Sequence, residues 1–172
     1  MAIQTILTYP DRRLKEISLP VETMTEQIRS LITDLTDTFT AAPGCVGIAA
    51  PQIGVLQRVI IVDVTRSASK KAKKDSSIHG NLICINPQIV ESQGSIMFRE
   101  GCLSVPDFTG NVVRSQSVTV SFRDEKFEER TISADGFEAI VLQHEIDHLN
   151  GVLFLDNVRS FKRDVFRRVK YQ

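Results

Sequence analysis

DGFEAIVLQHEIDHLNG, residues 135–151, is the stretch that decides the fold of this chain. Its apolar residues and two of its histidines recur at steps of three and four, as they do along one face of a helix. The residues on that face are Phe137, Ile140, Val141, His144 and His148. The pattern therefore predicts a helix over residues 135–150 that carries both histidines toward the core.

The two ends of this helix have their own signals. Asp135 and Glu138 are spaced as in a capping box, in which the two side chains accept hydrogen bonds from the first backbone N–H groups. Gly151 follows the last periodic residue and is typical of a helix stop. We therefore expect the helix to begin at Asp135 and to end at Asn150.

The same helix contains an HExxH motif. His144 and His148 lie about one turn apart, so both imidazoles can reach one metal ion at about 2 Å. Glu145 would lie beside the ion, where it could accept a proton from a water molecule whose pKa the ion lowers from about 15.7 to roughly 7. The motif indicates metal-dependent hydrolysis.

An ordinary helix is the simpler alternative, because an inward histidine is often a hydrogen-bonded core residue. The chain has only 3 histidines, however, and two of them flank Glu145 on this helix. A merely structural helix has little reason to bury that carboxylate. We therefore favour the metal site.

A catalytic ion of this kind needs a third protein ligand and keeps one position open for water. Cys102 is the best candidate, because Gly101 and Pro106 around it predict a shaped turn that could present a thiolate. The other candidates are Cys45, Cys84, Glu100 and Asp156. Cys84 is better explained as a buried, inert thiol.

Length and composition predict one compact domain over residues 1–172. The chain is 42% hydrophobic and 24% charged, and its 21 basic and 21 acidic residues give a formal net charge of 0. Net charge thus predicts no partner. The N-terminal residues resemble neither a signal peptide nor a membrane span, which favours a cytoplasmic protein with reduced cysteines.

The rest of the chain predicts an α+β fold with antiparallel sheet. Apolar periodicity predicts a helix over residues 23–41, preceded by a capping box of Thr23 and Glu26. Strand patterns fall at residues 58–64, 82–86, 117–122 and 128–133.

Two segments are rich in basic residues. Residues 66–81 contain lysines among serines and little that is apolar, which predicts an exposed loop in which His79 is inert. Residues 158–172 predict a basic amphipathic C-terminal helix. This helix either docks with a solvated basic face or contacts an acidic surface such as ribosomal RNA.

Three segments together resemble the motifs of the peptide deformylases. They are CVGIAAPQ at 45–52, EGCLS at 100–104 and QHEIDHLNG at 143–151. The resemblance covers the whole chain in order and spacing. It implies antiparallel sheets around a central helix that bears the HExxH motif, with an N-terminal and a C-terminal helix.

The resemblance also implies the metal and its ligands. The ligands of the family fall on Cys102, His144 and His148. Enzymes of this family use Fe(II), with zinc, nickel or cobalt as possible substitutes, whereas ligand chemistry alone does not choose among these metals.

The implied reaction removes the N-formyl group from the initiator methionine of new polypeptides and releases formate. Glu145 would carry the proton from water to the leaving nitrogen. The side-chain amide of Gln52 and the backbone N–H of Leu103 would stabilise the oxyanion.

Further positions carried over from the family concern the substrate. Val46 and Gly47 would run beside the peptide backbone as in an added strand. The methionine pocket would contain Phe98, Phe137, Ile140 and Val141, each of which ordinary core packing explains equally well. Glu100 and Arg114 would form a supporting ion pair.

The chain departs from the family pattern at three positions. Cys45 and Ile48 replace the usual glycine and leucine of the first motif, and Thr109 stands where some members have arginine. Cys45 puts substrate fit and oxidation sensitivity in doubt.

Two other functions stay open at this point. A zinc endopeptidase would share HExxH but take a downstream ligand such as Asp156. A deformylase-like binding protein would have no activity.

Overall fold

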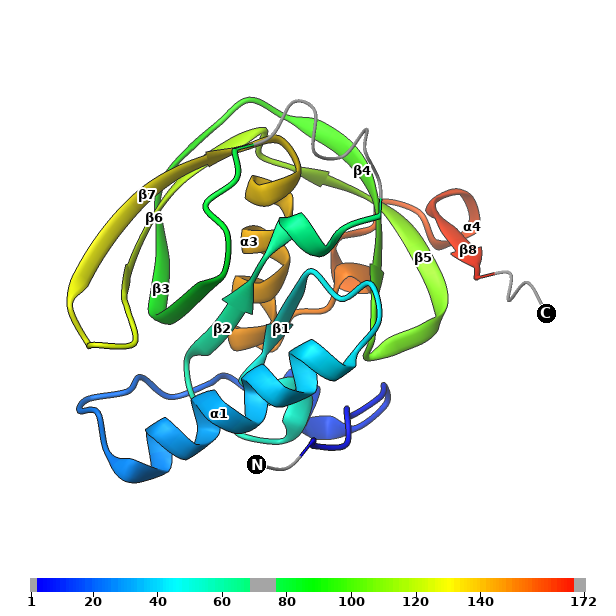
Figure 1. The fold of residues 1–172 in the computed structure, drawn as a ribbon. Helices are drawn as coiled ribbons and strands as arrows, with labels where there is room; N and C mark the ends of the chain where they lie inside the picture. The colour runs from blue at the N-terminus through cyan, green and yellow to red at the C-terminus, as the bar shows by residue number, and fades with distance from the viewer. Residues whose placement is uncertain (1–2, 69–76, 169–172) are drawn as a thin grey trace.

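The computed structural model describes residues 3–68 and 77–168, and it has the α+β architecture with antiparallel sheets that the sequence predicts (Figure 1). One sheet has five strands in the order β1-β2-β3-β6-β7, and the other has three in the order β4-β5-β8. The bounds of the first sheet are β1 Gly47–Ala49, β2 Val59–Val62, β3 Leu82–Gln93, β6 Ser117–Arg123 and β7 Glu129–Asp135. Those of the second are β4 Ile96–Cys102, β5 Val105–Arg114 and β8 Val165–Arg167.

Helix α3, Gly136–Leu149, carries the HExxH motif and packs against the five-stranded sheet. Almost all of its residues are buried, in keeping with a helix that has neighbours on several sides. Its apolar side chains join a core cluster with those of β2, β3 and β6. The predicted helix is present, with Asp135 as its N-cap and Asn150 as its C-cap, but the predicted capping box is wrong, because the Asp135 side chain makes no cap hydrogen bond.

Helix α1, Glu26–Ala41, covers a second part of the core (Figure 1). It buries Leu31, Leu35 and Phe39 against β1 and β2. The predicted capping box at Thr23 is wrong, because the helix begins two residues later. Thr25 is the N-cap, and its side chain accepts a hydrogen bond from the N–H of Ile28 at 3.3 Å.

All four predicted strands are present, with shifted ends. Strand β3 continues to Gln93, because its pairing with β6 resumes after two register shifts. One shift includes Asn86, where φ is +52°, and the other lies between Ile89 and Glu91. Strands β4 and β5 escaped prediction, since Pro106 and Gly110 in β5 are typical of turns rather than strand interiors.

The predicted C-terminal helix over 158–172 is wrong. Helix α4 is only Phe161–Asp164, and β8 follows it directly and pairs with β5. The free edge of β5 offers backbone hydrogen bonds that the short helix cannot match. Residues 169–172 lie outside the described residues, as do residues 69–76 of the predicted lysine-rich loop.

Short 3-10 helices complete the described chain at Arg12–Lys15, Ala50–Ile53, Val64–Arg66 and Phe154–Asn157. Among the described residues, every helix is too short or too polar to cross a bilayer.

Candidate active site

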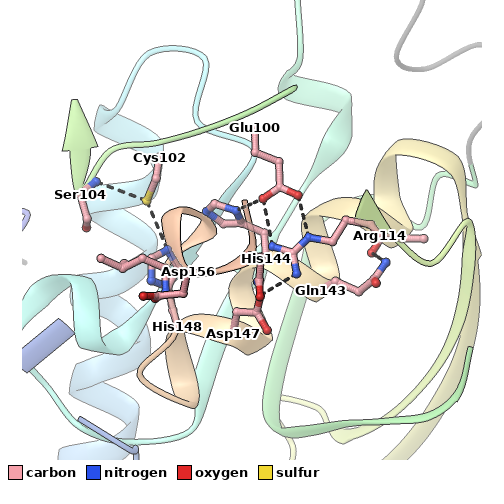
Figure 2. Close-up of polar contacts among 12 residues, drawn as sticks. Glu100, Cys102, Ser104, Arg114, Gln143, His144, Asp147, His148 and Asp156 are labelled. Carbon is pink, nitrogen blue, oxygen red and sulfur yellow. Dashed lines mark hydrogen bonds and ion pairs between the residues drawn. The ribbon is translucent and has the colours of Figure 1, made fainter. Parts of the chain in front are cut away.

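The end of β4 and the second half of α3 bring one cysteine and two histidines together. The ligand atoms of Cys102, His144 and His148 all lie within 4.8 Å of one another, and all three residues are buried. The Cys102 Sγ atom is 3.2 Å from His148 Nε2, and the two imidazole rings stand edge to face with centroids 5.0 Å apart (Figure 2).

This donor set fits a transition-metal ion. One thiolate and two imidazoles match catalytic sites that hold three protein ligands. Burial alone would raise the pKa of the Cys102 thiol, but His148 and His144 together lower that pKa well below its usual value, which favours the thiolate that a metal requires. The three residues therefore have the geometry of a metal site, and Cys102 also has the charge state that a metal requires.

Three of the other four candidate ligands lie outside this cluster. Cys84 belongs to the apolar core, as predicted, and burial raises the pKa of its thiol. Asp156 accepts a hydrogen bond from Lys15 Nζ at 2.5 Å and another from the N–H of Leu153. Cys45 donates its thiol proton to the carbonyl oxygen of Gly47 at 3.0 Å.

A chain of ion pairs supports His144 from behind (Figure 2). Its Nδ1 atom lies 2.7 Å from Glu100 Oε2, which leaves Nε2 for a ligand. Arg114 donates two hydrogen bonds to Glu100, at 2.6 and 3.0 Å, and a third to Asp147 at 2.5 Å. Burial opposes ionisation of Glu100, but His144 and Arg114 lower its pKa to about 2. The expected ion pair of Glu100 and Arg114 is thus present.

Glu145 lies beside the cluster with only 4% of its surface exposed. Among the described residues, no group donates a hydrogen bond to its Oε2 atom. Burial raises the pKa of this carboxyl group to about 7, although the two histidines oppose the shift. A buried carboxylate oxygen without a partner is costly unless it has a chemical task.

Gly47 provides the room that Glu145 occupies. A Cβ atom built on Gly47 would lie 2.4 Å from Glu145 Oε1. Any side chain at position 47 would therefore displace the carboxylate.

Gln52 is buried and fixed by three contacts. Its Oε1 atom accepts a hydrogen bond from the N–H of Ala49 at 2.9 Å, which directs its amide N–H groups the opposite way. Those groups donate to Cys102 Sγ at 3.4 Å and to Ser104 Oγ at 3.1 Å. The Gln52 amide is thus held next to the thiolate, and its N–H groups point toward Cys102 and Ser104.

A cavity of about 700 Å³ opens over this cluster. Phe98 and Phe137 meet on its wall, with ring centroids 5.5 Å apart. The structure brings all of the other predicted site residues to the cavity except His148, which is buried and does not line it. The residues that line it include Val46, Gly47, Gln52, Cys102, Leu103, Ile140, Val141, His144 and Glu145.

Three features of the structure were not predicted, and the first two belong to the site. Arg168 lines the cavity, although its sequence signal indicated a helix. Ser104 binds the Gln52 amide. His79, predicted to be inert, lies 2.6 Å from Glu138, a fully buried carboxylate in the first turn of α3. A buried glutamate on a helix requires a partner, and that requirement was the available signal.

Comparison with known proteins agrees with this geometry. The family model of polypeptide deformylases matches residues 3–164. A peptide deformylase of Rhizobium meliloti is 41% identical over 169 residues, which cover 98% of this chain and 92% of that protein.

Solved structures give the same result. A crystal structure of a peptide deformylase from Legionella pneumophila has a TM-score of 0.83 at 43% identity, covering 94% of this chain and 89% of that one. A structure of the Ehrlichia chaffeensis enzyme in complex with actinonin has a TM-score of 0.84 at 38% identity, covering 95% and 92%. Sequence, fold and site agree, and the chain therefore belongs to the polypeptide deformylase family.

Proposed function

We propose that this chain is a metal-dependent hydrolase that removes the N-formyl group from the N-terminal methionine of newly made polypeptides and releases formate. The observation that carries the proposal is the buried cluster of Cys102, His144 and His148 beside the Glu145 carboxylate, at the floor of a cavity. Membership of the family supplies the substrate class.

Cys102, His144 and His148 would hold the ion on the face of α3, and we propose Fe(II), with zinc, nickel or cobalt as substitutes. The ion would polarise the formyl carbonyl group and lower the pKa of the attacking water. The chain's own residues carry the rest of the reaction.

Glu145 would move the proton. Its Oε2 atom would accept a proton from the attacking water as the new C–O bond forms, and it would deliver that proton to the nitrogen as the C–N bond breaks. The products are formate and a free α-amine, so no covalent enzyme intermediate is needed. The absence of a described hydrogen-bond partner at Oε2 supports this role.

Gln52 and Leu103 would stabilise the oxygen of the formyl group as it gains negative charge. The Gln52 amide is positioned by Ala49, and both Gln52 and Leu103 line the cavity. Donors that are fixed before the reaction cost no reorganisation in the transition state.

The peptide would bind as an added strand. β1 lies at the edge of the five-stranded sheet, where a further strand can pair with it. Val46, just before β1, and Gly47, its first residue, also line the cavity. The methionine side chain would then enter the apolar part formed by Phe98, Phe137, Ile140 and Val141.

Formate release from a short N-formyl-methionyl peptide tests the proposal, with protein purified without oxygen and loaded with Fe(II). We expect Glu145→Gln to bind the metal but to lose about 10²- to 10⁴-fold in turnover. Glu26→Gln is the matched control, since that side chain is 93% exposed. A folded, metal-loaded wild-type protein that releases no formate would instead favour a binding protein without activity.

A zinc endopeptidase is the second alternative, and ligand variants separate it from a deformylase. We expect Cys102→Ser to lose the metal and Asp156→Asn to retain it. The pairing of Asp156 with Lys15 supports this expectation. The reverse result would favour the peptidase.

We further propose that residues 1–172 act as one catalytic domain in the cytoplasm. Contact with the ribosome through the basic segment 158–172 stays a prediction. In the described part of this segment, the basic residues lie on or next to the short α4 and β8 and not on one continuous helix. Cosedimentation with ribosomes, for the wild type and for a Lys162→Glu, Arg163→Glu variant, would test it.

A further inference from the structure

Strand β8 positions the end of the described chain against β5. Its three residues pair with Phe108, Thr109 and Gly110. The backbone N–H of Arg168 then donates to the carbonyl oxygen of Asp107 at 2.8 Å, which extends the ladder by one residue. The register of Arg168 relative to β5 is therefore fixed.

Strand alternation places the Arg168 side chain on one defined face of this sheet. Gly101, Thr109 and Phe166 lie opposite one another in a row across the three strands. Arg168 is two residues beyond Phe166, and Arg99 is two residues before Gly101, so all of them share that face. The contact of the Arg99 guanidinium with the Phe166 ring, 3.7 Å from its centroid, agrees with this arrangement.

Gly101 leaves the space that the Arg168 side chain occupies. A Cβ atom on Gly101 would lie 2.2 Å from Arg168 Nη2. Both residues line the active-site cavity, and Gly101 directly precedes Cys102. The guanidinium therefore lies on the cavity wall, next to the reaction centre.

Three charged side chains line this wall, and they differ in how well a bound ligand can reach them. Glu100 is held by Arg114 and His144, and Arg99 is stacked on Phe166. Arg168 is exposed, so a bound peptide can reach it. A planar guanidinium matches a carboxylate, to which it can donate two parallel hydrogen bonds.

We propose that Arg168 is a specificity-determining residue that binds an acidic side chain of the substrate, at the first or second position after formyl-methionine. This inference rests on the proposed function. A residue of an extended peptide advances about 3.3 Å, so a chain that leaves the methionine pocket passes the Gly101 wall within about two residues. The carboxylate of aspartate or glutamate there would meet the guanidinium.

Deformylation kinetics on a set of amidated peptides tests the proposal. The set comprises N-formyl-Met-Ala-Ala-Ala amide and its versions with aspartate or lysine at the second or third position. The amide removes the terminal carboxylate as a competing ligand. We expect aspartate at one position to raise kcat/KM about two- to fivefold over alanine, through KM, as suits an exposed ion pair. Lysine there should lower it, and added salt should reduce both effects.

Two variants show whether the effect is local. Arg168→Gln should bring the ratio of kcat/KM for the aspartate peptide to that for the alanine peptide close to 1, whatever its effect on the alanine peptide alone. Arg167→Gln removes the same charge from the opposite face of β8 and should keep the preference.

Several outcomes would overturn the assignment: equal kcat/KM for the three residue types at both positions, a preference that survives Arg168→Gln, or equal losses in the two variants. Failure of the proposed function is distinguishable, because the alanine peptide would then release no formate either.

Discussion

At the scale of single residues, the site is a small set of side chains whose charge states depend on one another. The Cys102 thiolate and the ionised Glu100 both depend on His144, and all three groups shift the pKa of Glu145. Burial is the largest influence on the pKa of each group; contacts reverse its direction at Cys102 and Glu100, whereas at Glu145 burial prevails. The chemistry therefore depends on the packing of α3 as much as on the motif.

Glu145 is expected to titrate near neutral pH in the metal-free protein. Burial raises its pKa to about 7, so the carboxyl group should be protonated below that pH and ionised above it. A divalent cation favours the charged form, so Zn(II) should move the titration to lower pH. Infrared spectra of the wild type and of Glu145→Gln would assign the band. A fully ionised Glu145 at pH 5 without metal would contradict the expectation.

Gly47→Ala should disable the enzyme without loss of the metal. The added Cβ would lie 2.4 Å from Glu145 Oε1 and would push the carboxylate aside. A misplacement of about 1 Å can cost about 10²-fold in rate, and we expect a loss of that order in kcat. Glu26→Gln again serves as the control, since that side chain is 93% exposed. Normal turnover by Gly47→Ala would show that Glu145 can relocate.

At the scale of elements, prediction from sequence succeeded for α1 and α3 and failed where backbone pairing decides the structure. The periodicity over 135–150 located α3, and the three motifs located every residue of the metal cluster. The pattern over 158–172 fits a helix equally well, yet β8 forms because β5 offers an unpaired edge. The pairing of β8 with the edge of β5 cannot be predicted from the local pattern of a single sequence.

The caps show the same limit. Asp135 and Glu138 have capping-box spacing, but both side chains bind Ser77, which is distant in sequence. Glu138 also accepts a hydrogen bond from the N–H of His79. Local spacing identified the right residues and the wrong partners, because a buried carboxylate takes the strongest donors that the fold brings to it.

The pair of His79 and Glu138 should stabilise the start of α3. The Glu138 side chain is fully buried, and His79→Ala removes one of its donors. We expect a loss of about 1–3 kcal/mol in the free energy of unfolding. A double-mutant cycle with Glu138→Gln, which keeps an acceptor oxygen at this position, tests the coupling: the double variant His79→Ala, Glu138→Gln should lose less than the sum of the two single variants. Urea unfolding of the four proteins measures both effects, and additive losses would exclude the coupling.

At the scale of the whole molecule, Arg114 and Glu100 connect the three-stranded sheet to α3, which packs against the five-stranded sheet. Glu100 lies on β4 and Arg114 on β5, while Asp147 on α3 accepts a hydrogen bond from the same guanidinium. Since His144 is held by Glu100, the relative position of sheet and helix also sets the position of a metal ligand. Stability and site geometry are thus linked through one buried network.

This linkage predicts a particular acid sensitivity of the metal-free protein. The pKa of Glu100 falls from an ordinary 4.5 to about 2 on folding. A carboxyl group with a lowered pKa contributes stability above its unfolded value and loses it as the pH falls through the folded value. The free energy of unfolding should therefore decline between pH 4.5 and 2. The Glu100→Gln variant should be less stable than the wild type at pH 5, and its free energy of unfolding should change less between pH 4.5 and 2. Glu100 is one of the groups that raise the pKa of His144, so the variant tests the pair of Glu100 and His144 together. Parallel declines in the two proteins would mean that other carboxylates cause the acid sensitivity, and that Glu100 does not tie the three-stranded sheet to the helix.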